Sequence, residues 1–231
     1  ILSADPPLGP IFGGTAVTVT GNDFGEGPIF CRFGRSLAVP ATRLHDEALR
    51  CVTPDMSMLA SQSLPVQVSR NLVDFATSSV KFMPHSPVVL EKLSVSRGPE
   101  TGGTDVLVIG SNFLDTPLLV CRLGLAKVPA IFLNESAVLC STPPLLRVLG
   151  GGSVEKKQGK PAAVEELRIS NDGQVFAESS LPFIYDHTVQ LVNILPSVGS
   201  VGGGNSVVVH SAGGFLPSPT LACRFGKVVV P

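Results

Sequence analysis

Apolar and polar residues alternate over short stretches of this chain, and the alternation recurs in three copies. In each copy a pair of glycines precedes valines at every second position: Val17 and Val19, Val106 and Val108, and Val207 and Val209. A period of two is typical of a strand that turns one face toward a core. We therefore expect these valines to be buried on the opening strand of three β-units.

The spacing of other landmarks supports the same repeat. The glycine pairs Gly13-Gly14, Gly102-Gly103 and Gly203-Gly204 recur after 89 and then 101 residues, and a Cys-Arg-x-Gly motif recurs after 90 and then 102. A Val-Pro follows each such motif, and the first two copies also share a later Cys-x-Thr-Pro. Paired glycines permit a tight turn into the strand. Short strands and turns at this period predict an all-β protein built of tandem β-sandwiches.

The order of these motifs resembles the IPT/TIG family, an immunoglobulin-like fold shared by plexins and transcription factors. The resemblance rests on PLGPIFGGTAVTVTGNDF, followed by CRFG, VPA, a second cysteine, TP and VQVS. It implies tandem immunoglobulin-like β-sandwiches, two complete and a third incomplete. The expected units are residues 1–84, residues 86–185 with a loop insertion near 145–163, and residues 188–231 as the N-terminal half of a third sandwich.

The loops of the second copy differ from those of the first. Asn171-Asp172-Gly173, between two strand-like runs, predicts a type I′ hairpin, in which both central residues have positive φ. The first copy has Asn71-Leu72 at this place, and because leucine tolerates positive φ poorly we expect a different turn there. Residues 150–161, rich in glycine and lysine, predict a flexible surface loop.

Four of the five cysteines occupy matching positions in the two complete copies. Cys31 and Cys51 are 20 residues apart, and Cys121 and Cys140 are 19 apart. We expect a disulfide within each copy, which indicates an oxidising compartment and contributes about 3 kcal/mol in the chain-entropy model. The alternative is buried free thiols, while zinc is disfavoured because C-x-x-C pairs are absent. Cys223 is unpaired within the chain, because the place of a second cysteine falls beyond Pro231.

Two surface features of the second copy are candidate contact sites. Asn134-Glu135-Ser136 is the only N-x-[ST] sequon, and in a secreted protein it is a candidate for an N-linked glycan. Leu107 and Ile109 lie on the outward side of the opening strand, where the first copy has threonines. They form an apolar patch that a loop, a neighbouring domain or another chain would cover.

Patterns of catalytic and metal-binding residues are missing from the sequence. The four histidines lie at unrelated repeat positions without metal-ligand spacing, and we expect them to be solvated loop or strand residues: His45, His85, His187 and His210. The arginines beside the repeated cysteines are expected to be solvated or ion-paired on the outer face: Arg32, Arg122 and Arg224. No G-x-S-x-G elbow occurs. We predict no enzyme activity, no metal and no cofactor.

Charge and composition exclude further classes of function. The 17 basic and 18 acidic residues leave a net charge of -1, which disfavours a nucleic-acid partner. No apolar run approaches the roughly 20 residues of a membrane span, so we expect no membrane contact within this segment. With one tyrosine and no tryptophan, a carbohydrate-binding accessory of a secreted enzyme also finds no support.

We therefore predict a non-catalytic structural or adhesive segment of a secreted or cell-surface multi-domain protein, with an extracellular filament subunit as the specific hypothesis. The alternative is the ligand-binding ectodomain of a plexin-like receptor, and the expected partners are neighbouring protein domains or chains. DNA-binding IPT domains are disfavoured by the neutral charge and paired cysteines. Half of a third sandwich leaves sheet edges unpaired, so we expect a window from a longer protein, with strands from another molecule as the alternative.

Overall fold

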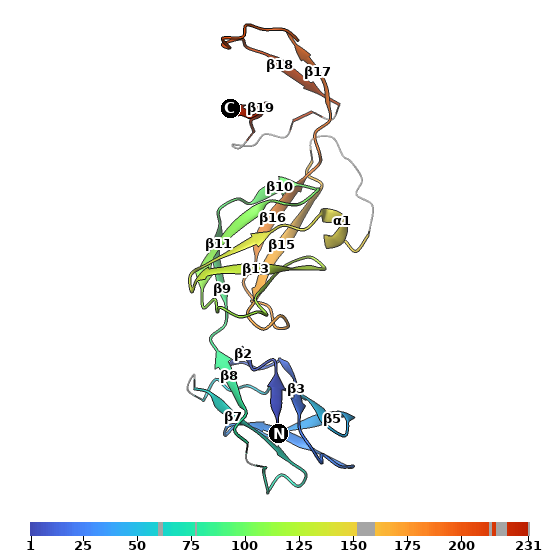
Figure 1. The fold of residues 1–231 in the computed structure, drawn as a ribbon, viewed down its shortest axis with the longest axis vertical. Helices are drawn as coiled ribbons and strands as arrows, with labels where there is room; N and C mark the ends of the chain where they lie inside the picture. Colours follow the sequence, from blue (N-terminus) through green and yellow to red (C-terminus); the bar gives the residue numbers. More distant parts are fainter. Residues whose placement is uncertain (60–61, 77, 152–159, 213, 216–220, 231) are drawn as a thin grey trace.

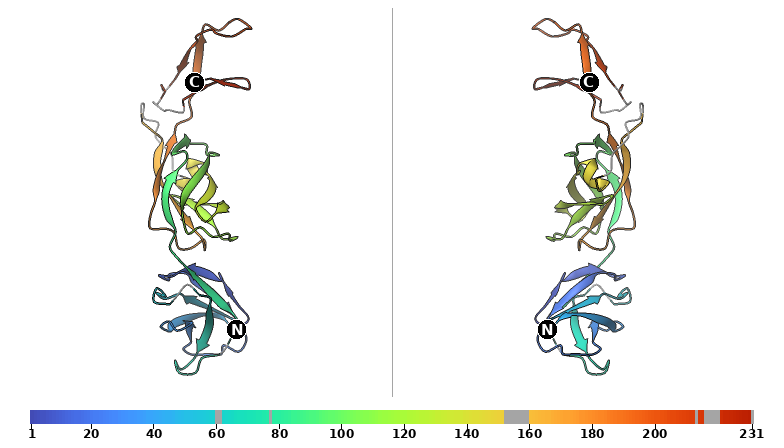
Figure 2. Two further views of the ribbon diagram at one scale, coloured as in Figure 1. Left: turned by 90° about the vertical axis from the view of Figure 1, so that its left-hand side faces the viewer. Right: turned by 90° about the vertical axis from the view of Figure 1, so that its right-hand side faces the viewer.

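The three repeats form three β-units that follow one another along an elongated molecule (Figure 1). The structure is a computed structural model, and it describes residues 1–59, 62–76, 78–151, 160–212, 214–215 and 221–230. The two side views in Figure 2 show the same end-to-end order, so the units are stacked along one axis. The predicted all-β class, with tandem immunoglobulin-like sandwiches, is confirmed.

The first unit is a sandwich of eight strands. They are β1 (Ser3–Asp5), β2 (Leu8–Pro10), β3 (Ala16–Thr20), β4 (Phe30–Phe33), β5 (Val39–His45), β6 (Ala48–Val52), β7 (Leu64–Ser69) and β8 (Lys81–His85). Their order is β1-β3-β6-β5-β4-β7-β8-β2. The beginning of β5 pairs with β4 and its remainder pairs with β6, so this strand connects the two layers.

The second unit repeats this topology strand for strand. Its elements are β9 (Val89–Leu93), β10 (Arg97–Pro99), β11 (Asp105–Ser111), β12 (Val120–Leu123), β13 (Ala126–Asn134), β14 (Ala137–Ser141), α1 (Leu145–Val148), β15 (Ala163–Ser170) and β16 (Leu181–Asp186). Their order is β10-β16-β15-β12-β13-β14-β11-β9. The one-turn helix α1 has no counterpart among the described residues of the first unit, and it buries Leu145 and Val148. The predicted loop at 150–161 lies largely outside the described residues.

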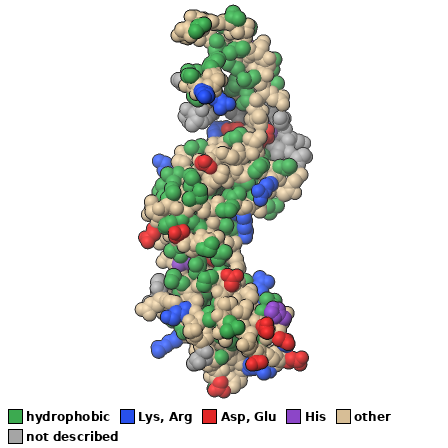
Figure 3. Space-filling view, viewed as in Figure 1, with side chains coloured by type: hydrophobic (Ala, Val, Ile, Leu, Met, Phe, Trp, Pro, Cys, Tyr) green, Lys and Arg blue, Asp and Glu red, His purple; other side chains and the backbone are tan. Residues whose placement is uncertain are grey.

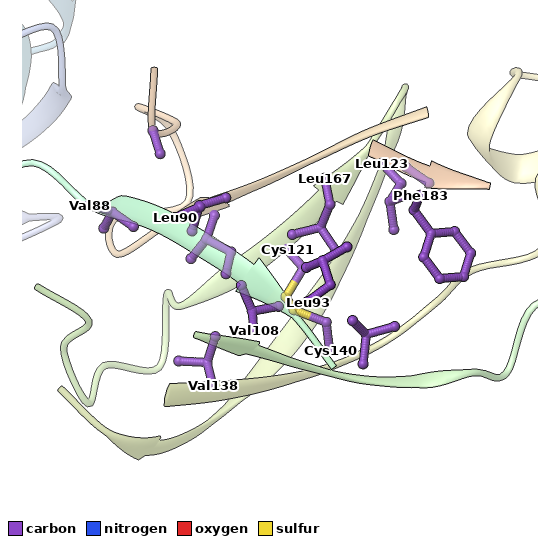
Figure 4. Packing of buried hydrophobic residues seen from close by; sticks show 14 of the residues in the cluster. Val88, Leu90, Leu93, Val108, Cys121, Leu123, Val138, Cys140, Leu167 and Phe183 are labelled. Carbon is purple, nitrogen blue, oxygen red and sulfur yellow. A yellow bond between two sulfur atoms is a disulfide. The ribbon is translucent and has the colours of Figure 1, made fainter. Parts of the chain in front are cut away.

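Each sandwich closes around a disulfide. Cys31 is bonded to Cys51 and Cys121 to Cys140, with 6.2 Å between the Cα atoms in both cases. Each bridge joins strands of opposite layers, and the alternating valines of β3 and β11 are fully buried beside it. Figure 4 shows the second core, where Leu93 and Val108 lie beside the disulfide and Val138 belongs to the same cluster. Burial of these side chains supplies the main stabilisation of each unit.

The third unit consists of two separate ribbons. β17 (Leu191–Leu195) pairs with β18 (Val208–Ser211), and β19 (Cys223–Phe225) pairs with β20 (Val228–Val230). Val207 and Val209 are less exposed than Val208 and His210, so the predicted period is present. The prediction that these two valines are buried is nevertheless wrong, because no facing layer covers them in the described part of the unit.

Two turn predictions are wrong, because both copies make the same turn, held by the side chain of Asn71 in the first copy and of Asp172 in the second. Leu72 has a φ of 64° and Gly173 a φ of 73°, so the two copies make the same turn, while Asp172 is not among the residues with positive φ. The side-chain oxygen of Asn71 accepts hydrogen bonds from the backbone N–H groups of Val73 and Asp74 at 3.0 and 2.9 Å. These bonds compensate leucine for its unfavourable backbone conformation.

Candidate functional site at the junction between the sandwiches

The upper rim of the first sandwich is a glycine-rich turn that opens β3. Gly13 and Gly14 have φ values of 82° and 91°, and a Cβ atom on Gly13 would lie 2.4 Å from the carbonyl oxygen of Thr53. The N–H of Gly14 donates to that same oxygen at 2.9 Å, and the N–H of Thr15 donates to the Thr53 hydroxyl at 3.0 Å. The turn is thereby held against the end of β6. It presents the Thr15 hydroxyl and the backbone of Ala16 toward the second sandwich.

The lower end of the second sandwich is the hairpin that follows β15. Asp172 Oδ1 accepts hydrogen bonds from the Ser170 hydroxyl at 2.7 Å and from the N–H groups of Gln174 and Val175 at 2.9 and 2.8 Å. Three donors to one carboxylate oxygen fix the conformation of this hairpin. They leave the second oxygen, Oδ2, directed away from the loop. Gln174 is the next side chain that projects from the hairpin toward the first sandwich.

The hairpin and the rim meet in direct hydrogen bonds. The Thr15 hydroxyl donates to Asp172 Oδ2 at 2.6 Å, and the two groups are 0% and 2% exposed. The side-chain amide of Gln174 bonds both backbone groups of Ala16, accepting from N–H and donating to C=O at 3.0 Å each. This imitates one rung of a β-ladder across the junction. We call these residues, Thr15, Ala16, Asp172 and Gln174, the junction.

His85, at the end of β8, lies beside the junction. One ring nitrogen, Nδ1, is 2.8 Å from the carbonyl oxygen of Ser86, while Nε2 is buried without a hydrogen-bond partner among the described residues. Burial lowers the pKa of His85, and the Ser86 carbonyl and the charge of Asp172 oppose this only in part. The neutral imidazole is therefore the form that fits this position.

A second set of polar contacts fixes the start of the linker to the third unit. Glu100 accepts from the N–H of Thr188 at 2.9 Å and lies 3.0 Å from Nδ1 of His187. Burial alone would raise the pKa of Glu100, but the hydrogen bonds from Thr188 and His187 outweigh it, and the pKa is lowered. His85 is the last residue of β8 and His187 follows β16, so the two occupy different positions of the repeat, as expected. Both are partly buried, which corrects the expectation that they are solvated.

Leu107 and Ile109 lie on the outer face of the β9-β11-β14-β13 layer, each half-buried. In register, Leu107 is opposite Leu139, and Leu139 is opposite Ile131, which is 61% exposed. Figure 3 shows hydrophobic side chains gathered over this layer, around β11. The same row of the first sandwich is polar: Thr18, Arg50 and Thr42. The structure therefore extends the predicted patch to two further strands.

The remaining predicted positions are dispersed. Asn134 is exposed at the end of β13, where its Oδ1 accepts a hydrogen bond from the N–H of Ser136 at 2.9 Å. Cys223 lies in β19 of the third unit. Within the described ranges, no group of three His, Cys, Asp or Glu side chains is placed to hold a metal, and no helix is long and apolar enough to cross a membrane.

The recurring arginines have a role that we did not predict. The guanidinium of Arg32 stacks on Phe75, 3.6 Å from the ring centroid, and that of Arg122 stacks on Phe176 at 4.0 Å. Neither arginine is ion-paired with a described residue. These cation–π contacts attach each hairpin to the outer face of its own sandwich. The signal in the sequence was the phenylalanine that recurs, followed by alanine, after each hairpin.

Comparison with known proteins agrees with the architecture. The family model described as IPT/TIG domain matches residues 1–83 and 88–183. The chain is 26% identical over 216 residues to human plexin-B3 and 27% identical over 227 residues to mouse fibrocystin-L. These alignments cover 91% and 97% of this chain, but only 10% and 5% of the relatives. The chain therefore spans a small part of the proteins that it matches.

Among solved structures, the chain is similar to the full extracellular region of plexin A4. The TM-score is 0.56 at 16% sequence identity, over 99% of this chain and 21% of that one. At this identity the similarity concerns the fold.

Proposed function

This chain belongs to the IPT/TIG domain family, and we propose that it is a rigid, non-catalytic structural or adhesive segment of a secreted or cell-surface multi-domain protein. The observation that carries the proposal is the junction between the two complete sandwiches. Its role is to hold the two units at a fixed angle, so that the segment acts as a spacer and its surface contacts have a defined geometry.

Two features of the junction limit rotation between the sandwiches. The connection between β8 and β9 is only the three residues 86–88. The hydrogen bonds of Thr15 and Ala16 add two separate points of attachment, on Asp172 and on Gln174. Rotation about the linker would break both attachments, and loss of the hydrogen bond from Thr15 to the charged Asp172 alone costs about 1.5–3 kcal/mol.

An extracellular setting has independent chemical support. A disulfide lies in each complete sandwich, and such bonds persist in oxidising compartments. Asn134 of the sequon is exposed at the end of β13, and an N-glycan needs such an accessible position. The solved plexin A4 structure to which the chain is similar is itself an extracellular region.

The finer role that we propose is a subunit of an extracellular filament, with the apolar row that includes Leu107 and Ile109 as its protein contact. The alternative is the ligand-binding ectodomain of a plexin-like receptor, to which the plexin-B3 relative points. Both roles use the same rigid segment. The domains of the parent protein distinguish them: a long tandem array favours the filament, whereas one membrane span with a cytoplasmic signalling domain favours the receptor.

The rigid-segment proposal is tested by NMR residual dipolar couplings on the whole chain. Rigidly joined sandwiches share one alignment tensor, and we expect the native chain to do so. In the double variant Thr15→Val with Gln174→Ala the two tensors should diverge. The matched control, Thr104→Val with Val73→Ala, changes the equivalent positions of the repeat, which lie outside the junction, and should keep one tensor. Different tensors in the native chain would refute the proposal.

A further inference from the structure

The outer face of the second sandwich carries a row of positive charges that the near-neutral total conceals. In register, Arg122 of β12 lies directly opposite Arg168 of β15 on one side and Lys127 of β13 on the other. All three are half-buried or exposed, and no described carboxylate lies within 4.0 Å of their nitrogen atoms. We call Arg168, Arg122 and Lys127 the cation row.

The cation row is only partly compensated within the protein. Adjacent strands are about 4.8 Å apart, and like charges directly opposite one another destabilise a sheet. The ring of Phe176 offsets some of this cost, with its centroid 4.0 Å from the Arg122 guanidinium and 5.1 Å from Lys127 Nζ. Lys127 also donates to the carbonyl oxygen of Gly173 at 2.8 Å. Arg168 is half-buried, and its side chain makes no hydrogen bond with a described residue.

The equivalent rows of the other units are built differently. In the first sandwich Gln67 stands in place of Arg168, and its side-chain oxygen accepts from Arg32 at 3.1 and 3.0 Å. Continuing the register by one residue places Ala38 where the second sandwich has Lys127. In the third unit Arg224 lies opposite Val229. The fold therefore needs only the central arginine, and the two flanking cations are particular to the second sandwich.

We propose that the cation row binds a sulfated polysaccharide. Two adjacent guanidinium groups and an ammonium group offer charge-assisted hydrogen bonds to oxyanions, for which the planar donors of arginine are well suited. A regularly spaced row of about 10 Å suits a chain that carries sulfate groups at intervals. Because the net charge of the whole chain is -1, such binding would come from this row and not from general attraction.

The position of the row disfavours an acidic peptide. Peptides commonly add to a free sheet edge or insert side chains in a groove. The row instead crosses β13, β12 and β15, and β12 is already paired on both sides. Glu166, two residues before Arg168 on the same face of β15, restricts the positive surface to a single line. The ligand must therefore lie across the strands.

The test is solution binding of a fluorescently labelled, size-defined sulfated oligosaccharide to the whole chain, at fixed ionic strength. Arg168→Gln installs the residue of the first sandwich and leaves the Phe176 contacts in place, so the fold is retained. We expect it to weaken binding roughly three- to tenfold, as for the loss of one charge-assisted hydrogen bond at an exposed site. The matched control Arg50→Gln removes an exposed arginine from β6 of the first sandwich, with the same change in net charge, and should bind like the native chain.

Three outcomes would overturn the proposal. In the first, the native chain fails to bind the sulfated oligosaccharide. In the second, Arg168→Gln and Arg50→Gln weaken binding equally, which would indicate diffuse electrostatic attraction. In the third, a poly-glutamate peptide of equal charge competes as well as unlabelled oligosaccharide, and Arg168→Gln weakens its binding. This result would assign the cation row to acidic peptides. A melting temperature of Arg168→Gln equal to that of the native chain establishes that loss of binding is not loss of fold.

Discussion

Replacement of Thr15 by valine is the sharpest test of the junction. Valine keeps the shape of threonine but removes the hydroxyl that donates to Asp172 at 2.6 Å. The carboxylate oxygen would then be buried without that donor. Loss of a hydrogen bond to a buried charged group costs about 1.5–3 kcal/mol. The cost cannot exceed the stabilisation of the whole junction, because separation of the sandwiches would return Asp172 to water.

The effect is measurable because the chain has a single tyrosine and no tryptophan. Tyr185 is buried in the second sandwich, so its fluorescence reports on that unit, while circular dichroism reports on both. We expect Thr15→Val to lower the urea midpoint of the sandwich that unfolds first by roughly 1 M. This shift is the expected loss of about 2 kcal/mol in the free energy of unfolding divided by an m-value of about 2 kcal/mol/M.

The control is Thr104→Val, at the equivalent position of the second sandwich, where the hydroxyl makes no hydrogen bond with a described residue. Its midpoints should stay close to those of the native chain. The reasoning is refuted if Thr15→Val leaves the transitions of both probes unchanged, or if the two variants behave alike.

Two further predictions concern the rim and the histidine beside it. Gly13→Ala should reduce the free energy of unfolding by more than about 2 kcal/mol, because its Cβ would meet the backbone of Thr53. Gly103→Ala, with a similar φ but nothing within 4 Å, should cost only the left-handed strain of about 1 kcal/mol; equal urea midpoints would contradict this. The pKa of His85 is lowered in the folded protein from its ordinary value of 6.5, so protonation of this histidine favours the unfolded chain. The contribution of neutral His85 to the free energy of unfolding is therefore complete above pH 6.5 and is lost as the pH falls from 6.5 toward the folded-state pKa. Between about pH 7.5 and about pH 5.5, urea titrations should show a smaller decrease in the free energy of unfolding for His85→Gln than for the native chain. Equal decreases would exclude His85 as a source of the pH dependence.

Much of the architecture was predictable because it depends on local pattern. The alternation of apolar and polar residues places Val17 and Val19 on the core face independently of the other strands, since a strand has only two faces. The cysteines could be paired because they recur in register with the strands that carry them. The turn at Leu72 was predicted wrongly from the φ preference of one residue, because the hydrogen bonds to Asn71 outweigh that preference.

The sequence by itself determined the fold class, the repeat and the disulfide positions, because each is set by spacing along the chain. Only the tertiary structure decided where the repeats touch. Thr15 and Asp172 are separated by 157 residues, and nothing in either local sequence indicates that stacking brings them together. The cation row has the same origin: Lys127 and Arg168 belong to no sequence motif, and strand register alone places them beside Arg122. Periodicity determines which face a side chain occupies, but its neighbours there depend on register and on how the units stack.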